Sequence, residues 1–192
     1  MRKIISVFQR NYDTDRLIRN EVVPGAEWVL AGEGVATRKY DGSACLISEG
    51  RFYKRYDAKK GKKPPEGFIP AQEEADELTG HFPGWLEVGD GPEDKWFRVA
   101  MDNYTNATVR ILTSGTYEAC GPHFQGNPEH FPEDTLVPHG EYWLIECPRY
   151  FDGIREFLRT RDIEGIVFWH SDGRMAKVKK KDYGLKRIPE TS

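Results

Sequence analysis

The sequence EGIVFWHSDGRMAKVK, residues 164–179, holds two short runs rich in β-branched, aromatic and other apolar residues, separated by an Asp-Gly pair. Runs of this kind are typical of strands, and Asp-Gly is typical of a tight turn. We therefore expect a β-hairpin with strands at Gly165–His170 and Arg174–Lys179. Side chains alternate along a strand, so Lys177 and Lys179 are predicted to point to the same face.

Further strands are predicted outward from this hairpin, because similar runs are bounded by Gly, Pro, Asp or Asn. They follow one another without regular intervening helices, which is typical of an α+β fold with mostly antiparallel strands. The runs are Ala44–Ser48, Arg51–Tyr56, Trp96–Ala100, Val109–Leu112 and Tyr142–Ile145.

Two helices are expected. Asp152–Thr160 begins with a capping-type Asp and places Ile154, Phe157 and Leu158 on one face, whereas Ala71–Thr79 is polar and ends before a glycine. The segment Pro122–Pro138 contains four prolines and is predicted to be an ordered loop.

Composition favours one globular domain spanning residues 1–192, a length that suffices for a buried core. The apolar runs are far shorter than the ~20 residues of a membrane span, and the first residues lack the pattern of a secretory signal. The three cysteines form no close pair, which argues against a zinc knuckle and suits a reducing compartment. We expect a cytoplasmic protein with no membrane partner.

The net charge of −3 argues against a general nucleic-acid coat, but the charges are unevenly distributed. Basic blocks at 54–63 and 177–187 flank an acidic segment at 66–94. The two basic blocks are compatible with one phosphate-binding face or with a solvated surface, and charge alone favours the solvated surface.

Four short motifs carry the chemistry, and each is weak on its own. In chain order they are Lys39-Tyr40-Asp41-Gly42, the aromatic–acid pair Tyr117-Glu118, Glu164-Gly165 before an apolar strand, and Lys177-Val178-Lys179. Their order and the separation of 13 residues between Glu164 and Lys177 are more informative than any single motif.

This series resembles the covalent nucleotidyltransferases, the superfamily of DNA ligases, RNA ligases and mRNA-capping guanylyltransferases, from about Val35 to Tyr183. The resemblance implies an adenylation domain of mostly antiparallel sheets with flanking helices, similar to the ATP-grasp fold. Only nine residues follow Tyr183, too few for the C-terminal OB domain of DNA ligases and capping enzymes.

Within the superfamily, the chain is most similar to ATP-dependent RNA ligases of the RNA ligase 1 type, including the small vertebrate-type 5′–3′ RNA ligases. ATP-dependent DNA ligases have an arginine five positions after the motif lysine, where this chain has Ala44. Ser43 directly follows the glycine, which is more similar to the RNA ligase 1 type. Arg38 is a departure, because many relatives have Glu before the lysine. The other matching elements are Tyr117-Glu118, Gly126-Asn127-Pro128 and Pro138-His139-Gly140.

The resemblance implies that Lys39 accepts AMP from ATP and that AMP then passes to an RNA 5′-phosphate, which a 3′-hydroxyl attacks. Lysine must be neutral to attack, and an unperturbed lysine of pKa ~10.4 is neutral only about 0.04% of the time at pH 7, a cost of ~4.6 kcal/mol. Lys177, Lys179 and Mg²⁺ (or Mn²⁺) reduce this cost and hold the α-phosphate. Asp41 is an alternative influence that stabilises Lys39 as a cation.

The resemblance also assigns binding roles. Glu118 is expected to bind the ribose or shape the metal site, and Glu164 to hold the metal ion through water. Arg55 is expected to contact the nucleotide or an RNA phosphate, or to be a surface charge. Tyr142 or Trp143 is a candidate for stacking on adenine, with a buried core position favoured for Trp143. Contacts with RNA phosphates are expected from Lys180, Lys181 and Lys186.

The expected partners are therefore ATP and RNA with 5′-phosphate and 3′-hydroxyl ends, with no obligate protein partner evident. Two alternatives stay open: a nucleotidyltransferase with another acceptor, of the capping or protein-modifying kind, and a catalytically idle RNA-binding homologue.

Overall fold

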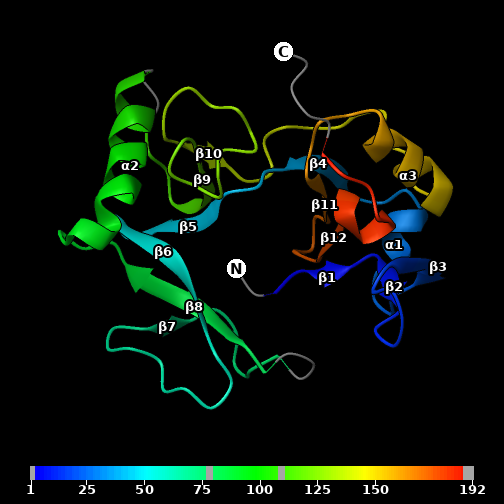
Figure 1. Ribbon diagram of the computed structural model, residues 1–192, viewed down its shortest axis with the longest axis horizontal. Coiled ribbons are helices and arrows are strands. Elements are labelled where there is room, and N and C mark those ends of the chain that lie inside the picture. Colours follow the sequence, from blue (N-terminus) through cyan, green and yellow to red (C-terminus); the bar gives the residue numbers. More distant parts are fainter. Residues whose placement is uncertain (1–2, 77–79, 108–110, 188–192) are drawn as a thin grey trace. The chain divides into compact units, whose positions relative to one another are not determined.

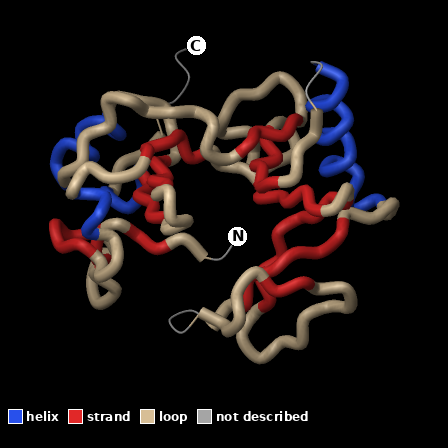
Figure 2. Tube along the Cα trace, turned by 180° about the vertical axis from the view of Figure 1, so that it is seen from behind, coloured by secondary structure: helices blue, strands red, loops and turns tan. Residues whose placement is uncertain are grey.

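The computed structural model describes residues 3–76, 80–107 and 111–187, which fold into two compact units (Figure 1). We call residues 4–40 and 140–192 the terminal unit, and residues 1–3 and 41–139 the central unit. Two compact units can belong to one domain, so the single domain over residues 1–192 stays a prediction. In both units, strands make up most of the regular structure (Figure 2).

The terminal unit contains a four-stranded sheet in the order β1-β12-β11-β4. The predicted hairpin is confirmed, because β11 and β12 pair antiparallel with Ile166 opposite Val178. Strand β4 pairs antiparallel with the other edge of β11, and β1 lies parallel to β12 (Figure 1). The bounds are β1 Ile5–Ser6, β4 Val35–Lys39, β11 Gly165–Trp169 and β12 Met175–Lys179, with a small second sheet of β2 Phe8–Arg10 and β3 Ile18–Val22.

One face of the four-stranded sheet is packed in the core of the terminal unit. Helix α3 (Phe151–Arg159) confirms the helix predicted there, although it starts one residue earlier and Asp152 makes no capping bond. Its apolar stripe is buried together with the inward residues of the sheet, which drives the packing. The buried residues concerned are Ile154, Phe157, Leu158, Ala36, Ile166, Phe168, Ala176 and Val178.

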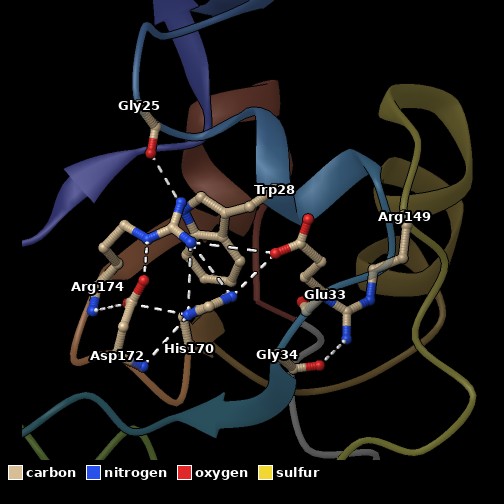
Figure 3. Close-up of polar contacts among 8 residues, drawn as sticks. All are labelled: Gly25, Trp28, Glu33, Gly34, Arg149, His170, Asp172 and Arg174. Atoms are coloured by element: carbon tan, nitrogen blue, oxygen red, sulfur yellow. Dashed lines mark hydrogen bonds and ion pairs between the residues drawn. The ribbon is translucent and has the colours of Figure 1, made fainter.

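A polar cluster holds the turn of the β11–β12 hairpin against the segment between α1 (Glu27–Leu30) and β4 (Figure 3). His170 lies between two carboxylates, with Nε2 2.9 Å from Glu33 and Nδ1 2.8 Å from Asp172. Arg149 donates to the backbone oxygens of Glu33 and Gly34, at 3.1 and 2.9 Å. These contacts fix the start of β4 and therefore help to set the position of Lys39 at its end.

The central unit contains a six-stranded antiparallel sheet in the order β10-β9-β5-β6-β8-β7. Strands β5 and β6 confirm two predicted strands, whereas β8 was not predicted. The predicted loop Pro122–Pro138 ends in a strand, β10. The bounds are β5 Ser43–Ser48, β6 Arg51–Ala58, β7 Ile69–Pro70, β8 Phe82–Glu87, β9 Gly115–Cys120 and β10 Thr135–Pro138.

The predicted strand Trp96–Ala100 is wrong, because these residues belong to helix α2 (Lys95–Ala107), which follows a short 3-10 turn at Pro92–Asp94. Ala100 and Tyr104 are buried at helical spacing against the six-stranded sheet. The apolar face therefore extends one turn beyond the short run that suggested a strand.

Three other sequence predictions differ from the structure. Tyr142–Ile145 forms no strand and makes only an isolated bridge between Trp143 and Thr37. Residues 71–76 of the predicted helix Ala71–Thr79 are not helical, and 77–79 lie outside the described residues. Of the predicted strand Val109–Leu112, residues 109–110 lie outside the described residues, and 111–112 are not in a strand.

Among the residues that the structure describes, no helix has the length and apolar character needed to cross a membrane.

Candidate active site

Lys39, Glu164 and Lys179 meet at one end of the four-stranded sheet. The register places Gly165 opposite both Lys39 on β4 and Lys179 on β12, and Glu164 directly precedes Gly165. The Glu164 carboxylate accepts a hydrogen bond from the Lys39 ammonium through Oε2, and its Oε1 lies 3.1 Å from Lys179 Nζ. Residues that the sequence separates by 125 positions, Lys39 and Glu164, thus come into contact, and the carboxylate lies between two ammonium groups.

Gly165 makes this arrangement possible through its lack of a side chain. A Cβ at this position would lie 2.3 Å from the backbone oxygen of Val178, closer than real Cβ contacts come. The glycine of the Glu-Gly motif is therefore required by the close approach of β12, and it lets the lysine-bearing strands lie at either side of β11.

The end of β12 is fixed by a buried carboxylate. Asp182 accepts a hydrogen bond from the backbone nitrogen of Lys179 at 2.9 Å and forms an ion pair with Arg10. The strand then enters a 3-10 helix, Lys180–Tyr183. Asp182 therefore orients the strand residue that presents the Lys179 side chain.

Lys177 lies on the same face of the sheet as Lys39 and Lys179. Its register partner Val167 also pairs with Thr37, which is two residues before Lys39 on β4. Burial lowers the pKa of Lys177 to about 8, and the positive charges of Lys179 and Lys39 act in the same direction. Among the described residues, its ammonium has no hydrogen-bond or ion-pair partner. A partly buried cation beside two other cations is suited to an anionic ligand.

The charges of the cluster favour phosphate. Lys39, Lys177 and Lys179 contribute three positive charges and Glu164 one negative charge, which leaves two positive charges in excess. Burial alone raises the pKa of Glu164, but the two lysines in contact with it overcome this effect and hold its pKa below the ordinary value. Glu164 is therefore ionised at neutral pH.

Trp143 and Tyr142 are both exposed, at 61% and 54%. The expectation that Trp143 is a core residue is therefore wrong. Its backbone pairs with Thr37, so its side chain lies on the lysine face, two residues along β4 from Lys39. The indole Nε1 donates to Gly140 O at 3.0 Å, which orients the ring.

Glu118 lies on β9 of the central unit and is buried among polar partners. Its Oε1 accepts a hydrogen bond from the backbone nitrogen of Gly42 at 3.1 Å, and its Oε2 lies 2.8 Å from His139 Nε2. A Cβ at Gly42 would lie 2.2 Å from Ala119 O, so the glycine of the first motif is also required by a close approach.

Arg55 lies on β6, in the central unit. Its Nε donates to Asp57 at 2.9 Å, and its guanidinium lies over the ring of Trp85 at 5.4 Å. The structure therefore brings together four of the six candidate site residues within the terminal unit, whereas Glu118 and Arg55 belong to the central unit.

Lys180 differs from its expected role at the RNA surface. It is 3% exposed, and its ammonium donates to Arg161 O at 2.6 Å, which makes it a structural residue. Lys181 and Lys186 are exposed. Arg38, the departure from the family pattern, lies over the ring of Tyr40 at 4.8 Å and reaches Asp162 O at 3.5 Å.

Two contacts of the site were missed by sequence reasoning. His139 was noted only as part of a tripeptide, although it contacts Glu118 directly. Asp182 has no role among the four motifs, although it fixes the strand that carries Lys179. The separation of 21 positions between His139 and Glu118 leaves no local signal for the first contact, whereas Asp182 lies only three positions after Lys179.

The chain is similar to proteins named RNA ligase 1. It is 28% identical to that of Pongo abelii over 68% of this chain, 24% to that of Rattus norvegicus and 25% to that of Mus musculus over 79%. No protein-family model matches. The chain spans about half the length of the Pongo abelii protein (51%) and 67% of each rodent protein. These likenesses support an RNA ligase family for this chain.

Proposed function

We propose that this chain is the catalytic part of an ATP-dependent RNA ligase that works through a covalent lysyl-AMP intermediate. One observation carries the proposal: Lys39, Lys177 and Lys179 gather around Glu164 on one face of a sheet, with positive charge in excess. Similarity to proteins named RNA ligase 1 supports an RNA substrate.

The first step is attack of the neutral Lys39 amine on the α-phosphorus of ATP. An N–P bond forms, the bond from this phosphorus to the bridging oxygen breaks, and pyrophosphate leaves. Lys177 and Lys179 stabilise the charge on the phosphoryl oxygens, because their ammonium groups come from the same face. The proton of Lys39 passes to solvent, since a carboxylate with a lowered pKa, such as Glu164, holds a proton poorly.

In the second step, an oxygen of the RNA 5′-phosphate attacks the same phosphorus, forming a phosphoanhydride and restoring the Lys39 amine. In the third step, the 3′-hydroxyl oxygen attacks the RNA 5′-phosphorus, its proton is lost, and AMP leaves. Each step forms one P–O or P–N bond and breaks another. ATP and the two RNA ends therefore supply all the atoms and the free energy.

A divalent metal fits this site only together with the nucleotide. Among the described residues, no group of three His, Cys, Asp or Glu side chains is placed to hold a metal ion. Mg²⁺ is commonly bound by one carboxylate, water and substrate phosphates, a mode that Glu164 suits. When bound, Mg²⁺ or Mn²⁺ would neutralise phosphate charge. We propose Glu118 as a ribose ligand, because one hydrogen bond on each oxygen fixes the orientation of its carboxylate. Each oxygen keeps a lone pair that can accept from a ribose hydroxyl.

The nucleobase is proposed to stack on Trp143, which presents an exposed indole on the lysine face. Arg55, Lys181 and Lys186 are proposed contacts for RNA phosphates. A cytoplasmic location remains part of this proposal.

The test is incubation of the purified chain with Mg²⁺ and [α-³²P]ATP, followed by 5′-phosphorylated RNA. The wild type should take up label that Lys39→Ala abolishes, and should then seal RNA. Label from GTP in place of ATP would indicate a capping-type enzyme. Label without sealing would indicate another acceptor, and absence of label would indicate an idle homologue.

A further inference from the structure

Glu118 and His139 form a buried polar pair in the central unit. The carboxylate of Glu118 and the imidazole of His139 are 10% and 15% exposed. An ionised carboxylate only accepts hydrogen bonds, so His139 Nε2 carries the proton that lies between them. With Gly42 N on the other oxygen, both oxygens of Glu118 are held by donors in fixed directions.

The sheet fixes the place of the imidazole. His139 directly follows β10, and its backbone nitrogen donates to Thr116 O at 3.0 Å, next to the paired residues Pro138 and Tyr117. The Cα of His139 is therefore held by the same strand that carries Glu118. The donor reaches Glu118 through only two side-chain torsions.

The remaining ring nitrogen shows that stability alone does not explain this histidine. His139 Nδ1 is buried and has no hydrogen-bond partner within the described part of the chain. Leaving a buried polar atom without a hydrogen-bond partner lowers the stability of the fold. A glutamine would offer the same donor without a second ring nitrogen, but through three torsions, which fix a donor less tightly.

We propose that His139 is a positioning residue for recognition of the nucleotide sugar. By holding Oε2 of Glu118, it leaves the free lone pairs of the carboxylate aimed at a ribose hydroxyl. This inference rests on the proposed function, in which Glu118 binds the ribose. His139 does not touch the reacting atoms, and its loss acts through the orientation of Glu118.

The experiment compares adenylylation of the enzyme by ATP, 2′-deoxy-ATP and 3′-deoxy-ATP. Wild type is expected to prefer ATP over at least one deoxy analogue. His139→Ala should reduce that preference about tenfold or more, the usual size of a lost hydrogen bond to a charged group, by raising KM for ATP more than it lowers kcat. His139→Gln should keep most of the preference, because its amide reaches Glu118.

The controls separate this role from folding. His139→Asn keeps a polar side chain too short to reach Glu118, and should lose the preference even if His139→Ala does not fold. His81→Ala, at an exposed histidine of the same unit, should retain it. Unchanged preference in a folded His139→Ala or His139→Asn variant overturns the inference. A wild type that takes no label from ATP overturns the proposed function, and this inference with it.

Discussion

Lys39 and Glu164 form an ion pair between the last residue of β4 and the residue that precedes β11. The side chains are 19% and 9% exposed, so the pair is largely removed from solvent. A neighbouring carboxylate favours the ammonium form of a lysine, whereas the proposed attack on phosphorus needs the neutral amine. The further stabilisation of the Lys39 cation by Asp41 stays a prediction from the sequence. Glu164 thus contacts both Lys39 and Lys179, and in the proposed mechanism its charge opposes deprotonation of Lys39.

Glu164→Gln should therefore move the pH dependence of adenylylation to lower pH. Removing the negative charge beside Lys39 makes its neutral form easier to reach, and each tenfold gain in the neutral fraction corresponds to about 1.4 kcal/mol. The maximal rate should fall, because the residue proposed to hold the metal ion is altered. Initial rates at saturating ATP between pH 6 and 9.5 check this, with each profile normalised to its own maximum.

Glu156→Gln is the matched control, because Glu156 pairs with Arg159 on the exposed surface of α3. Its profile should coincide with that of the wild type. A Glu164→Gln profile with an unchanged or higher midpoint would contradict the role assigned to the ion pair.

Lys177→Met should stabilise the fold while abolishing adenylylation. Burial and two neighbouring cations lower the pKa of Lys177 from 10.5 to about 8, so the folded state disfavours its charge. At pH 7 the ammonium is present in both folded and unfolded states, and the gain from removing it is up to about 3 kcal/mol. Urea unfolding at pH 7 measures the gain, with Lys181→Met as the exposed control.

The sign of the pH effect follows from the same lowered pKa. Between pH 8 and 10.5 the unfolded chain binds more protons than the folded one at Lys177, so the stability of the wild type rises with pH in this window. The advantage of Lys177→Met should therefore shrink from pH 7 to pH 9.5. A constant difference would show that the effect is packing and not charge.

The hairpin, the lysine pair and α3 were predictable because their information is local. Strand alternation places Lys177 and Lys179 on one face, and the 3.6-residue period places Ile154 and Leu158 in the core. The order of the motifs also singled out Lys39 and Glu164, and the structure places the two side chains in contact.

The remaining features depend on partners distant in the sequence. The five consecutive residues from Trp96 match a strand pattern, and only Tyr104, one turn further, completes the apolar face of helix α2. The residue type of Trp143 favours a core position, but its backbone forms only an isolated bridge with Thr37, and the residue is 61% exposed. The contact of His139 with Glu118 depends on the register of β9 and β10.

The motif glycines should be intolerant of even a methyl group. Gly165→Ala and Gly42→Ala place a Cβ 2.3 and 2.2 Å from a backbone oxygen, and backbone cannot move aside cheaply. Each should destabilise the protein by about 1–3 kcal/mol or more. Gly89→Ala is the matched control, because its Cβ meets nothing closer than Asp94 at 3.7 Å. Thermal unfolding compares the three, and equal midpoints would refute the close-approach argument.

Trp143→Ala should weaken ATP binding with little change in stability. Its indole is 61% exposed and oriented by one hydrogen bond to Gly140, so truncation removes little buried surface. Stacking of a base on an aromatic ring contributes about 1–3 kcal/mol, which corresponds to a rise in KM of roughly 5- to 150-fold. Trp143→Phe should recover part of this loss, because a smaller ring keeps a stacking face.

Tyr142→Ala is the matched control, because Tyr142 is similarly exposed but its neighbour Trp143 is the residue paired with Thr37. If Tyr142→Ala raises KM for ATP and Trp143→Ala does not, the base stacks on Tyr142. The bridge between Trp143 and Thr37 then does not identify the stacking residue.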